Sequence, residues 1–115
     1  MLTLLTCLTL TAIDGDSIRC NGTNMRMLGP GAPNQYGVDA PEIYRPECER
    51  ERQLGYIAKD RLTQLLSGAV VADTGVKDRY GRPLVYVMLP GDVTAGEVLM
   101  AEGLARSWPG NVGWC

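Results

Sequence analysis

Charged side chains that could do chemistry together stand in four short segments. Two segments are acidic, residues 14–17 (Asp-Gly-Asp-Ser) and 38–42 (Val-Asp-Ala-Pro-Glu), and two are basic, Arg26 and residues 77–82 (Lys-Asp-Arg-Tyr-Gly-Arg). Carboxylate and carbonyl oxygens are ligands for hard divalent cations, and a carboxylate can take a proton from water. Guanidinium groups bind phosphate oxygens with paired donors. The combination suits hydrolysis of a phosphodiester, in which negative charge grows on the phosphate.

Each segment taken alone also has a purely structural interpretation. Asp-Gly-Asp is most often a turn, and Asp39 and Glu42 could simply precede a helix. Arg26 and Arg82 could be solvated residues of strands. The catalytic hypothesis therefore depends on a fold that brings the four segments together.

The composition narrows the choice of mechanism. The chain has 115 residues, which fits a single domain over residues 1–115. It contains no His, so a general base must be a carboxylate, Lys, Tyr or thiolate, and metal ligands must come mainly from Asp, Glu or Cys. The net charge of −2 argues against binding nucleic acid by overall charge, although local Arg clusters can still attract a phosphate.

The first 28 residues predict an antiparallel meander. Apolar and polar residues alternate over 7–13, 17–20 and 23–28, as in half-buried strands. The dipeptides Asp14-Gly15 and Asn21-Gly22 between them are strong signals for hairpin turns.

The remaining elements follow from similar signals. Gly and Pro predict a loop, apolar residues at helical spacing predict a helix, alternation predicts strands, and a capping box begins a second helix. These elements are the loop 29–37, the helix 46–67, the strands 69–73 and 83–89, the helix from Thr94 to Gly103, and an ordered coil over 107–115. The order indicates an α+β fold, a five-stranded OB-type β-barrel with two main helices.

The first predicted helix is amphipathic. Pro46 suits its first turn, and Glu51 lies with two other glutamates near its positive N-terminal end. Gly55 weakens the helix interior and indicates close packing. The face expected to pack on the barrel consists of Leu54, Ile57, Ala58, Leu62, Leu65 and Leu66.

Together, the four segments resemble the motifs of the thermonuclease (staphylococcal-nuclease-like) family. That family has Asp-Gly-Asp-[Ser/Thr], an Arg on the next strand, Asp-[Ala/Thr]-Pro-Glu and Asp-[Lys/Arg]-Tyr-Gly-Arg, and residues 96–105 look like its closing helix. The resemblance extends from Cys7 to about Arg106. It implies the same barrel and a calcium-dependent nuclease that cuts DNA or RNA, prefers accessible single strands and leaves 3′-phosphate ends.

The resemblance also implies roles for the acidic residues. Asp16 and Asp39 match the carboxylates that hold Ca²⁺, with the backbone carbonyl of Ala40 as a further ligand. Glu42 matches the acid that activates or positions the attacking water.

The basic residues match the substrate-binding set of the family. Arg26 and Arg82 match the arginines on the scissile phosphate, and Arg79 and Tyr80 match the Lys-Tyr pair on an outer phosphate. Arg79 replaces the usual Lys and keeps its charge.

One segment departs from the family's pattern. The usual spacing Arg-x-x-Gly-[Ile/Val]-Asp is lengthened near residues 30–37, which places an added loop beside the metal site. This loop could gate the site, bind a base through Tyr36 or reshape access for the substrate.

The four cysteines favour disulfides and an oxidising compartment. The chain has no Cys-x-x-Cys pair, which disfavours a zinc site, and four reduced, buried thiols are the alternative. In the expected fold Cys7 and Cys20 face each other across the first hairpin, and we predict the pairs Cys7–Cys20 and Cys48–Cys115.

The expected location is secreted or periplasmic, with a signal peptide that is not part of this chain. No stretch is long and apolar enough to span a membrane. We expect a monomer whose partner is DNA or RNA, with no membrane partner.

Two other functions fit the same fold. A catalytically silent OB-type module could bind nucleic acid without cutting it, although the chain has the full set of catalytic residue types. A secreted module could instead use the added loop to bind another protein. Calcium-dependent cleavage separates the nuclease from both.

Overall fold

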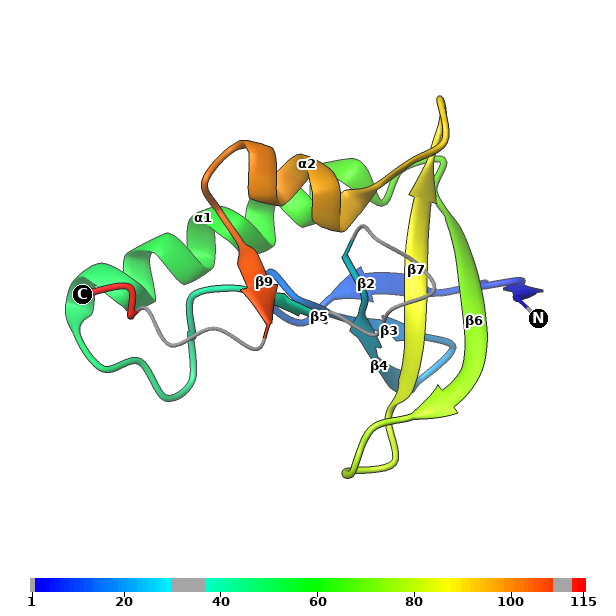
Figure 1. Ribbon diagram of the computed structural model, residues 1–115, viewed down its shortest axis with the longest axis horizontal. Coiled ribbons are helices and arrows are strands. Elements are labelled where there is room, and N and C mark those ends of the chain that lie inside the picture. Colours follow the sequence, from blue (N-terminus) through cyan, green and yellow to red (C-terminus); the bar gives the residue numbers. More distant parts are fainter. Residues whose placement is uncertain (1, 30–36, 109–112) are drawn as a thin grey trace.

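The computed structural model describes residues 2–29, 37–108 and 113–115, in which a curled sheet lies beside two helices (Figure 1). The strands are β1 (Thr3–Leu5), β2 (Leu10–Ala12), β3 (Ser17–Cys20), β4 (Thr23–Met27), β5 (Gly37–Asp39), β6 (Val70–Lys77), β7 (Pro83–Leu89), β8 (Val93–Thr94) and β9 (Arg106–Trp108). The helices are α1 (Glu49–Leu65) and α2 (Ala95–Ala101). The α+β class and the two main helices are as predicted.

The predicted meander is confirmed. β2, β3 and β4 pair antiparallel in sequence order. Asn21 and Gly22 between β3 and β4 have φ values of 51° and 84°. A two-residue hairpin turn needs this left-handed conformation, which Asn and Gly adopt most easily.

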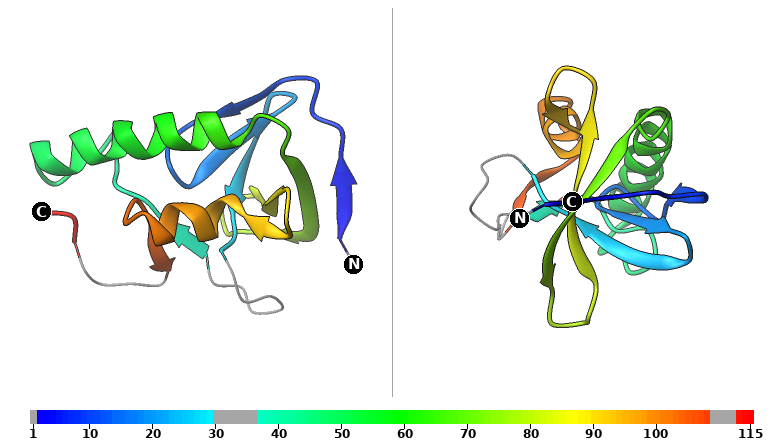
Figure 2. Two further views of the ribbon diagram at one scale, coloured as in Figure 1. Left: turned by 90° about the horizontal axis from the view of Figure 1, so that it is seen from above. Right: turned by 90° about the vertical axis from the view of Figure 1, so that its right-hand side faces the viewer.

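The sheet is strongly curled. Its strand order is β1-β6-β7-β4-β3-β2, and β4 and β7 are the parallel pair in this order. β1 and β2 therefore lie at opposite edges, yet residues 6–9 alone connect them, so the two edges must approach each other. The end view on the right of Figure 2 shows this curl. The parallel pairing sets Arg26 opposite Leu84 and so brings Arg26 close to the start of β7.

The strand count differs from the five predicted. In the described part of the chain β1, β5, β8 and β9 are additional short strands. The predicted strand 7–13 is shortened to β2 because the Asn21 side chain binds the backbone before it. Its amide oxygen accepts the N–H groups of Leu8 and Thr9, and its amide nitrogen donates to the Thr6 carbonyl.

α1 begins at Glu49, later than the predicted start at Pro46. The reason is that Cys48 is the N-cap, with an extended backbone (φ −159°, ψ 167°). Its sulfur accepts the N–H of Glu51 at 3.4 Å, which satisfies one of the donors that the first helical turn leaves unpaired.

The buried face of α1 is rotated relative to the predicted one. Ile57 was predicted to pack on the barrel and is 52% exposed, so this prediction is wrong. The predicted close packing at Gly55 is confirmed, because a Cβ there would lie 2.8 Å from Ile43 Cγ1 and 2.9 Å from the Pro41 carbonyl oxygen. The buried residues of α1 are Glu51, Gly55, Ala58 and Leu62.

The predicted start and end of α2 are close to those observed. Thr94 Oγ1 accepts the N–H of Glu97, and the Glu97 carboxylate accepts the N–H of Thr94, which completes the capping box. After the helix, the Leu104 N–H donates to the Leu99 carbonyl and Gly103 has a φ of 76°, the pattern of a glycine-ended helix.

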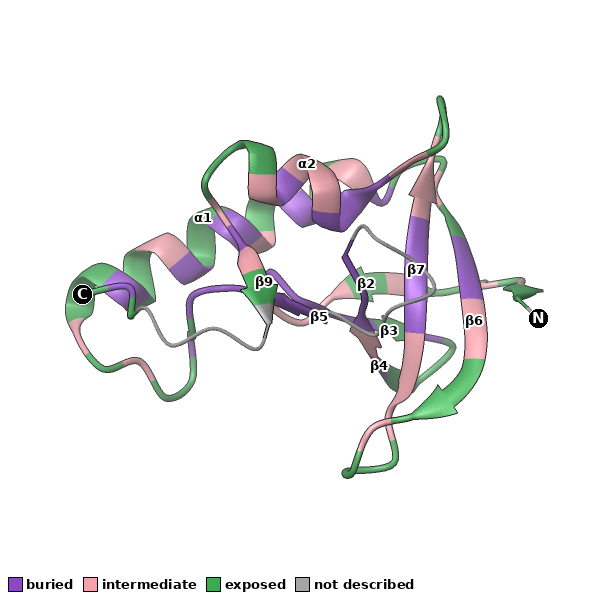
Figure 3. Cartoon of the chain, in the orientation of Figure 1, coloured by how far each residue is buried: buried purple, intermediate pink, exposed green. Residues whose placement is uncertain are grey.

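The main core lies between the concave side of the sheet and the two helices (Figure 3). It unites residues from β3, β4, β5, β7, α1 and α2, and the fully buried ones include Ile18, Met27, Val38, Leu62, Val85 and Leu99. Val38 belongs to β5, so burying it also fixes the strand that carries Asp39.

Both predicted disulfides are present. Cys7 is bonded to Cys20, and Cys48 is bonded to Cys115. The second bond attaches the end of the tail to the start of α1. Trp114 beside it is buried, and the Arg106 guanidinium lies 3.8 Å from the centre of its ring.

The loop predicted at 29–37 falls mainly outside the described residues. The same holds for the roles expected of the added segment, including base binding by Tyr36. Within the described residues, no helix is both long and apolar enough to cross a membrane.

Candidate active site

Asp16 lies where the turn between β2 and β3 meets the segment that follows β5. Its Oδ2 accepts the backbone N–H of Ala40 at 2.9 Å, and its Oδ1 accepts the Ser17 hydroxyl at 3.1 Å. The residue is only 5% exposed. These contacts bring together the two acidic motifs.

Gly15 allows this close approach. A Cβ at Gly15 would lie 2.7 Å from the Cβ atoms of both Ala40 and Ala58, closer than real side-chain contacts. The turn is therefore seated between the segment after β5 and the middle of α1. The glycine of the Asp-Gly-Asp motif is therefore required by packing.

The Asp16 carboxyl is strongly perturbed. Burial and the neighbouring Asp14 carboxylate raise the pKa of Asp16 to about 8, although the Arg26 guanidinium and the Ala40 N–H act in the opposite direction. Asp14 is fixed nearby because its Oδ1 accepts the Asp16 N–H at 3.0 Å. The site therefore holds more negative charge than its own cations neutralise.

Asp39 and Glu42 belong to the same acidic group. Partial burial raises the pKa of Asp39. The positive charges of Arg26 and Arg106 lower this pKa, but burial and the negative charges of Glu51 and Asp14 outweigh them. Glu42 is exposed by surface area, yet the burial that remains raises its pKa, with further contributions from the charges of Asp14, Asp39 and Glu51. The predicted acidic residues thus lie close enough to repel one another.

This donor set fits a hard cation in its chemistry. It consists of carboxylate and carbonyl oxygens, which Ca²⁺ prefers, and a cation would relieve the repulsion described above. Over residues 2–29, 37–108 and 113–115, no group of three or more His, Cys, Asp or Glu side chains is gathered tightly enough to hold a metal ion. The predicted cation site of Asp16, Asp39 and the Ala40 carbonyl contains two such side chains, and it stays a prediction.

Arg26 connects the acidic group to a neighbouring pocket. Its Nη2 donates to the Val38 carbonyl at 3.0 Å and lies 3.9 Å from Asp16 Oδ2. Its side chain remains 22% exposed. Arg26 also lines the pocket, so one side chain borders both regions.

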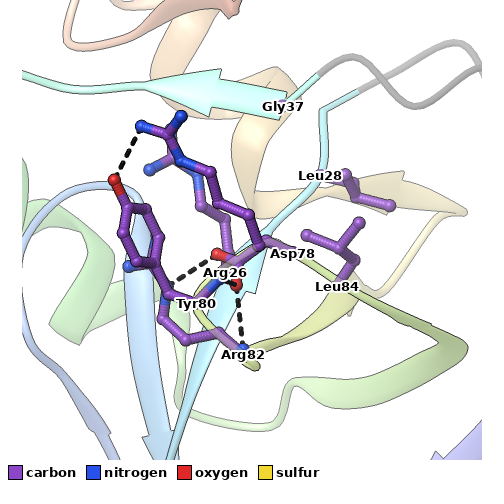
Figure 4. Close-up of a pocket in the computed structure, with 8 residues that line it drawn as sticks. Arg26, Leu28, Gly37, Asp78, Tyr80, Arg82 and Leu84 are labelled. Carbon is purple, nitrogen blue, oxygen red and sulfur yellow. Dashed lines mark hydrogen bonds and ion pairs between the residues drawn. The ribbon is translucent and has the colours of Figure 1, made fainter.

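The pocket has a volume of about 560 Å³ and one basic side (Figure 4). Figure 4 shows Arg26, Tyr80 and Arg82 on one side of it and Leu28 and Leu84 on the other. Its lining consists of Arg26, Leu28, Gly37, Asp78, Arg79, Tyr80, Arg82 and Leu84. The predicted substrate-binding residues are therefore gathered in one place.

Tyr80 is the aromatic centre of this basic side. Arg79 Nη2 donates to the Tyr80 hydroxyl at 2.7 Å. The guanidinium carbons of Arg79 and Arg82 lie 4.9 Å and 5.7 Å from the centre of its ring. Cation–π contacts of this kind hold arginines near an aromatic face while leaving donors for a ligand.

Asp78 shapes the turn that carries these residues. It accepts the N–H groups of Tyr80 and Arg82 at 2.9 Å each, and the Arg82 Nε at 2.8 Å. Burial raises the pKa of Asp78. The hydrogen bonds from Arg82 and Tyr80 and the charge of Arg82 together lower this pKa by more, so the net shift is downward. Asp78 therefore stays charged and orients Arg82.

Comparison with known proteins agrees with this arrangement. A family model described as "Staphylococcal nuclease homologue" matches residues 35–111, well over half of the chain. The chain belongs to the staphylococcal nuclease homologue family. The resemblance found from the motifs is thereby confirmed.

A curated relative supports the same assignment. The thermonuclease of Staphylococcus hyicus is 37% identical over 102 residues, which cover 83% of this chain and 54% of that protein. The chain therefore spans about half the length of this relative.

The family match includes some of the candidate residues and not others. Residues 35–111 contain Asp39, Glu42 and Arg82 but neither Asp16 nor Arg26. The structure itself connects those two to the matched region, through the hydrogen bonds to Ala40 and Val38. In this staphylococcal nuclease homologue the site is thus assembled from both parts of the chain.

Two acidic residues of the site were not predicted from the sequence. Asp14 had been treated only as part of a turn, and Glu51 only as a helix-start glutamate. The signal for Glu51 is its place at helical spacing with Gly55, Ala58 and Leu62, the buried stripe of α1. A glutamate on such a stripe needs buried partners, which the structure supplies.

Proposed function

We propose that this chain is a nuclease that hydrolyses phosphodiester bonds in DNA or RNA and requires calcium. The observation that carries the proposal is the placement of Arg26 between the acidic group and the arginine-lined pocket. A phosphate in the pocket would lie against guanidinium donors, and one of these, Arg26, is 3.9 Å from the Asp16 carboxylate. Membership of the staphylococcal nuclease homologue family and the thermonuclease name of the relative support this function.

In this proposal the acidic group has two tasks. Asp16, Asp39 and the Ala40 carbonyl hold the calcium ion, which when bound supplies positive charge to offset that of the reacting phosphate. Glu42 accepts a proton from the attacking water or positions it. Its raised pKa makes it a stronger base.

The basic residues stabilise the charge that develops on the phosphate. Arg26 and Arg82 donate to its non-bridging oxygens, and their planar forks suit this better than an ammonium group would. Arg79 and Tyr80 contact an outer phosphate of the bound strand. Cleavage would leave a 3′-phosphate, with the 5′-oxygen departing.

The remaining expectations belong to the same proposal. In this proposal the curled sheet is a barrel of the OB type, and residues 1–115 form one domain that acts as a monomer on accessible, mainly single-stranded nucleic acid. Its two disulfides support a secreted or periplasmic location, where such bonds persist.

The test is cleavage of a fluorophore-quenched single-stranded DNA oligonucleotide and its RNA counterpart. The folded, disulfide-bonded protein is measured with calcium, with a chelator, and as Glu42→Gln and Arg26→Ala variants. Calcium-dependent cleavage that collapses in both variants supports the proposal. Absence of cleavage with either nucleic acid contradicts it and favours a silent binding module.

A further inference from the structure

The Glu51 carboxylate is buried at the start of α1, and no step of the proposed reaction uses it. The residue is only 6% exposed. Its Oε2 accepts the backbone N–H of Glu42 at 3.0 Å, and its Oε1 accepts the backbone N–H of Glu47 at 2.8 Å. Hydrogen bonds from backbone N–H groups to a carboxylate are among the stronger ones in proteins. Both oxygens of Glu51 are therefore committed to the segment that carries Glu42.

A second contact holds the same segment on α1. One helical turn after Glu51, a Cβ at Gly55 would lie 2.9 Å from the Pro41 carbonyl oxygen and 3.1 Å from that of Glu42. The backbone on both sides of Glu42 therefore rests directly on the first turns of α1.

Glu51 is itself held in place by the start of the helix. Its N–H donates to the sulfur of Cys48, the N-cap, and Cys48 is bonded to Cys115. The positive end of the helix also favours a carboxylate in the first turn. Glu51 can therefore act as a fixed support for its neighbours.

The Glu42 side chain lacks comparable support. It is exposed, and within the described residues its carboxylate has no hydrogen-bond partner. The contacts found for Glu42 in the described residues are therefore those of its backbone, which determines the point from which the carboxylate reaches out.

We infer that Glu51 is a positioning residue, which fixes the backbone of Glu42 and so the place from which the Glu42 carboxylate reaches the attacking water. This inference rests on the proposed nuclease function. A displacement of about 1 Å in a reacting group can cost on the order of 100-fold in rate. Loss of the support should therefore lower kcat more than it changes substrate binding.

The test compares Glu51→Gln with Glu49→Gln. Gln at 51 keeps the size but turns one acceptor into a donor that faces a backbone N–H. Glu49 lies in the same helical turn, is exposed and loses the same charge on substitution. With calcium and the single-stranded oligonucleotide, we expect kcat to fall about tenfold or more in Glu51→Gln, with KM within about twofold, since the phosphate-binding residues are unaltered. Glu49→Gln should match the wild type.

Amide hydrogen exchange measured by NMR provides a readout that does not depend on activity. In Glu51→Gln the N–H groups of Glu42 and Glu47 should exchange faster than in the wild type. The Ala40 N–H, which is bound to Asp16, should be unchanged and shows that the site remains folded.

The outcomes separate the two claims. If Glu51→Gln keeps the kcat of Glu49→Gln in an active protein, the positioning role is wrong and the nuclease proposal stands. If the wild type cuts neither DNA nor RNA, the proposed function fails and with it any role of Glu51 in the reaction. Unchanged exchange at Glu42 and Glu47 in Glu51→Gln overturns the support itself, whether or not the protein is active.

Discussion

The site has an acidic region, which is the acidic group around Asp16, and a basic region, which is the arginine-lined pocket around Tyr80. The two regions are built in opposite ways. Asp16 is buried with too little compensating charge, so that its pKa is raised to about 8. Asp78, among the pocket arginines, is fully hydrogen-bonded and its pKa is lowered. The acidic region thus holds uncompensated negative charge, whereas the charges of the basic region are paired and hydrogen-bonded. Arg26 is the residue that both regions share.

Removing Arg26 should strongly lower activity. Arg26→Ala takes away a donor to the phosphate and a positive charge beside Asp16, and loss of one such donor typically costs about 100- to 1000-fold in kcat. Arg26→Lys keeps the positive charge but lacks the paired donors of a guanidinium, so its kcat should lie between those of the wild type and Arg26→Ala. Initial cleavage rates at saturating substrate measure this.

Arg19→Ala is the matched control for this experiment. Arg19 lies on the adjacent strand β3, is exposed, and donates to Asn24. If Arg19→Ala and Arg26→Ala lower kcat equally, Arg26 acts only through its charge, and its proposed role between the acidic and basic regions is refuted.

Asp16→Asn should separate stability from activity. The raised pKa means that Asp16 holds its proton more tightly in the folded, calcium-free protein than in the unfolded chain. The contribution of Asp16 to stability is therefore fully present below about pH 3.8 and is lost as the pH rises toward 8. The Asn variant removes this loss. Because each pKa unit corresponds to about 1.4 kcal/mol, a gain of about 2 kcal/mol or more is expected at pH 8, with cleavage abolished.

Urea unfolding of calcium-free protein at pH 4 and pH 8 measures this gain. The variant should exceed the wild type at pH 8 and approach it at pH 4. A variant that is less stable than the wild type at pH 8 would show that the acidic region is not strained.

Asp78→Asn should weaken the basic region by loosening its turn. The Asn side chain can still accept from backbone N–H groups but loses the ion pair with Arg82. Misplacing one guanidinium should lower kcat by about tenfold, a smaller cost than removing it. Asp92→Asn, on an exposed turn elsewhere, provides the same charge change as a control.

If Asp78→Asn instead raises the cleavage rate, Arg82 is restrained rather than oriented by Asp78. The pairing of charges in the basic region would then not serve activity as proposed.

Arg79→Ala and Tyr80→Phe should have the smallest effects. Both residues line the pocket and are exposed, Tyr80 by 69%, so in the proposed function their contacts with substrate are outer ones. We expect KM to rise about threefold with kcat nearly constant, because outer contacts bind ground state and transition state alike. For Arg79→Ala the dependence of KM on salt should also weaken. An unchanged KM in both variants would exclude them from substrate binding.

Local signals account for what the sequence predicted well. The Asn21-Gly22 turn and the Thr94–Glu97 capping box depend on neighbouring residues, and both are present. The four site segments were also recognised locally, because each is a short motif. The prediction that these segments lie close together came from the resemblance to a family and not from the local pattern.

Tertiary contacts account for what the sequence did not predict. The short strands β5 and β9 exist because they pair with each other, which neither sequence signals alone. The burial of Glu51 and the exposure of Ile57 reflect how α1 is rotated on the sheet, which depends on packing at Gly55. The pKa of Asp16 likewise depends on burial that no motif reveals.

The central claim is that the acidic region becomes competent only when calcium binds. A calcium titration of one protein preparation, followed by calorimetry and by cleavage of the single-stranded oligonucleotide, tests it most directly. The account predicts that binding and cleavage rise together over the same calcium range and that both are lost in Asp16→Asn. Cleavage that persists in chelator, or calcium binding that survives in Asp16→Asn, would contradict it.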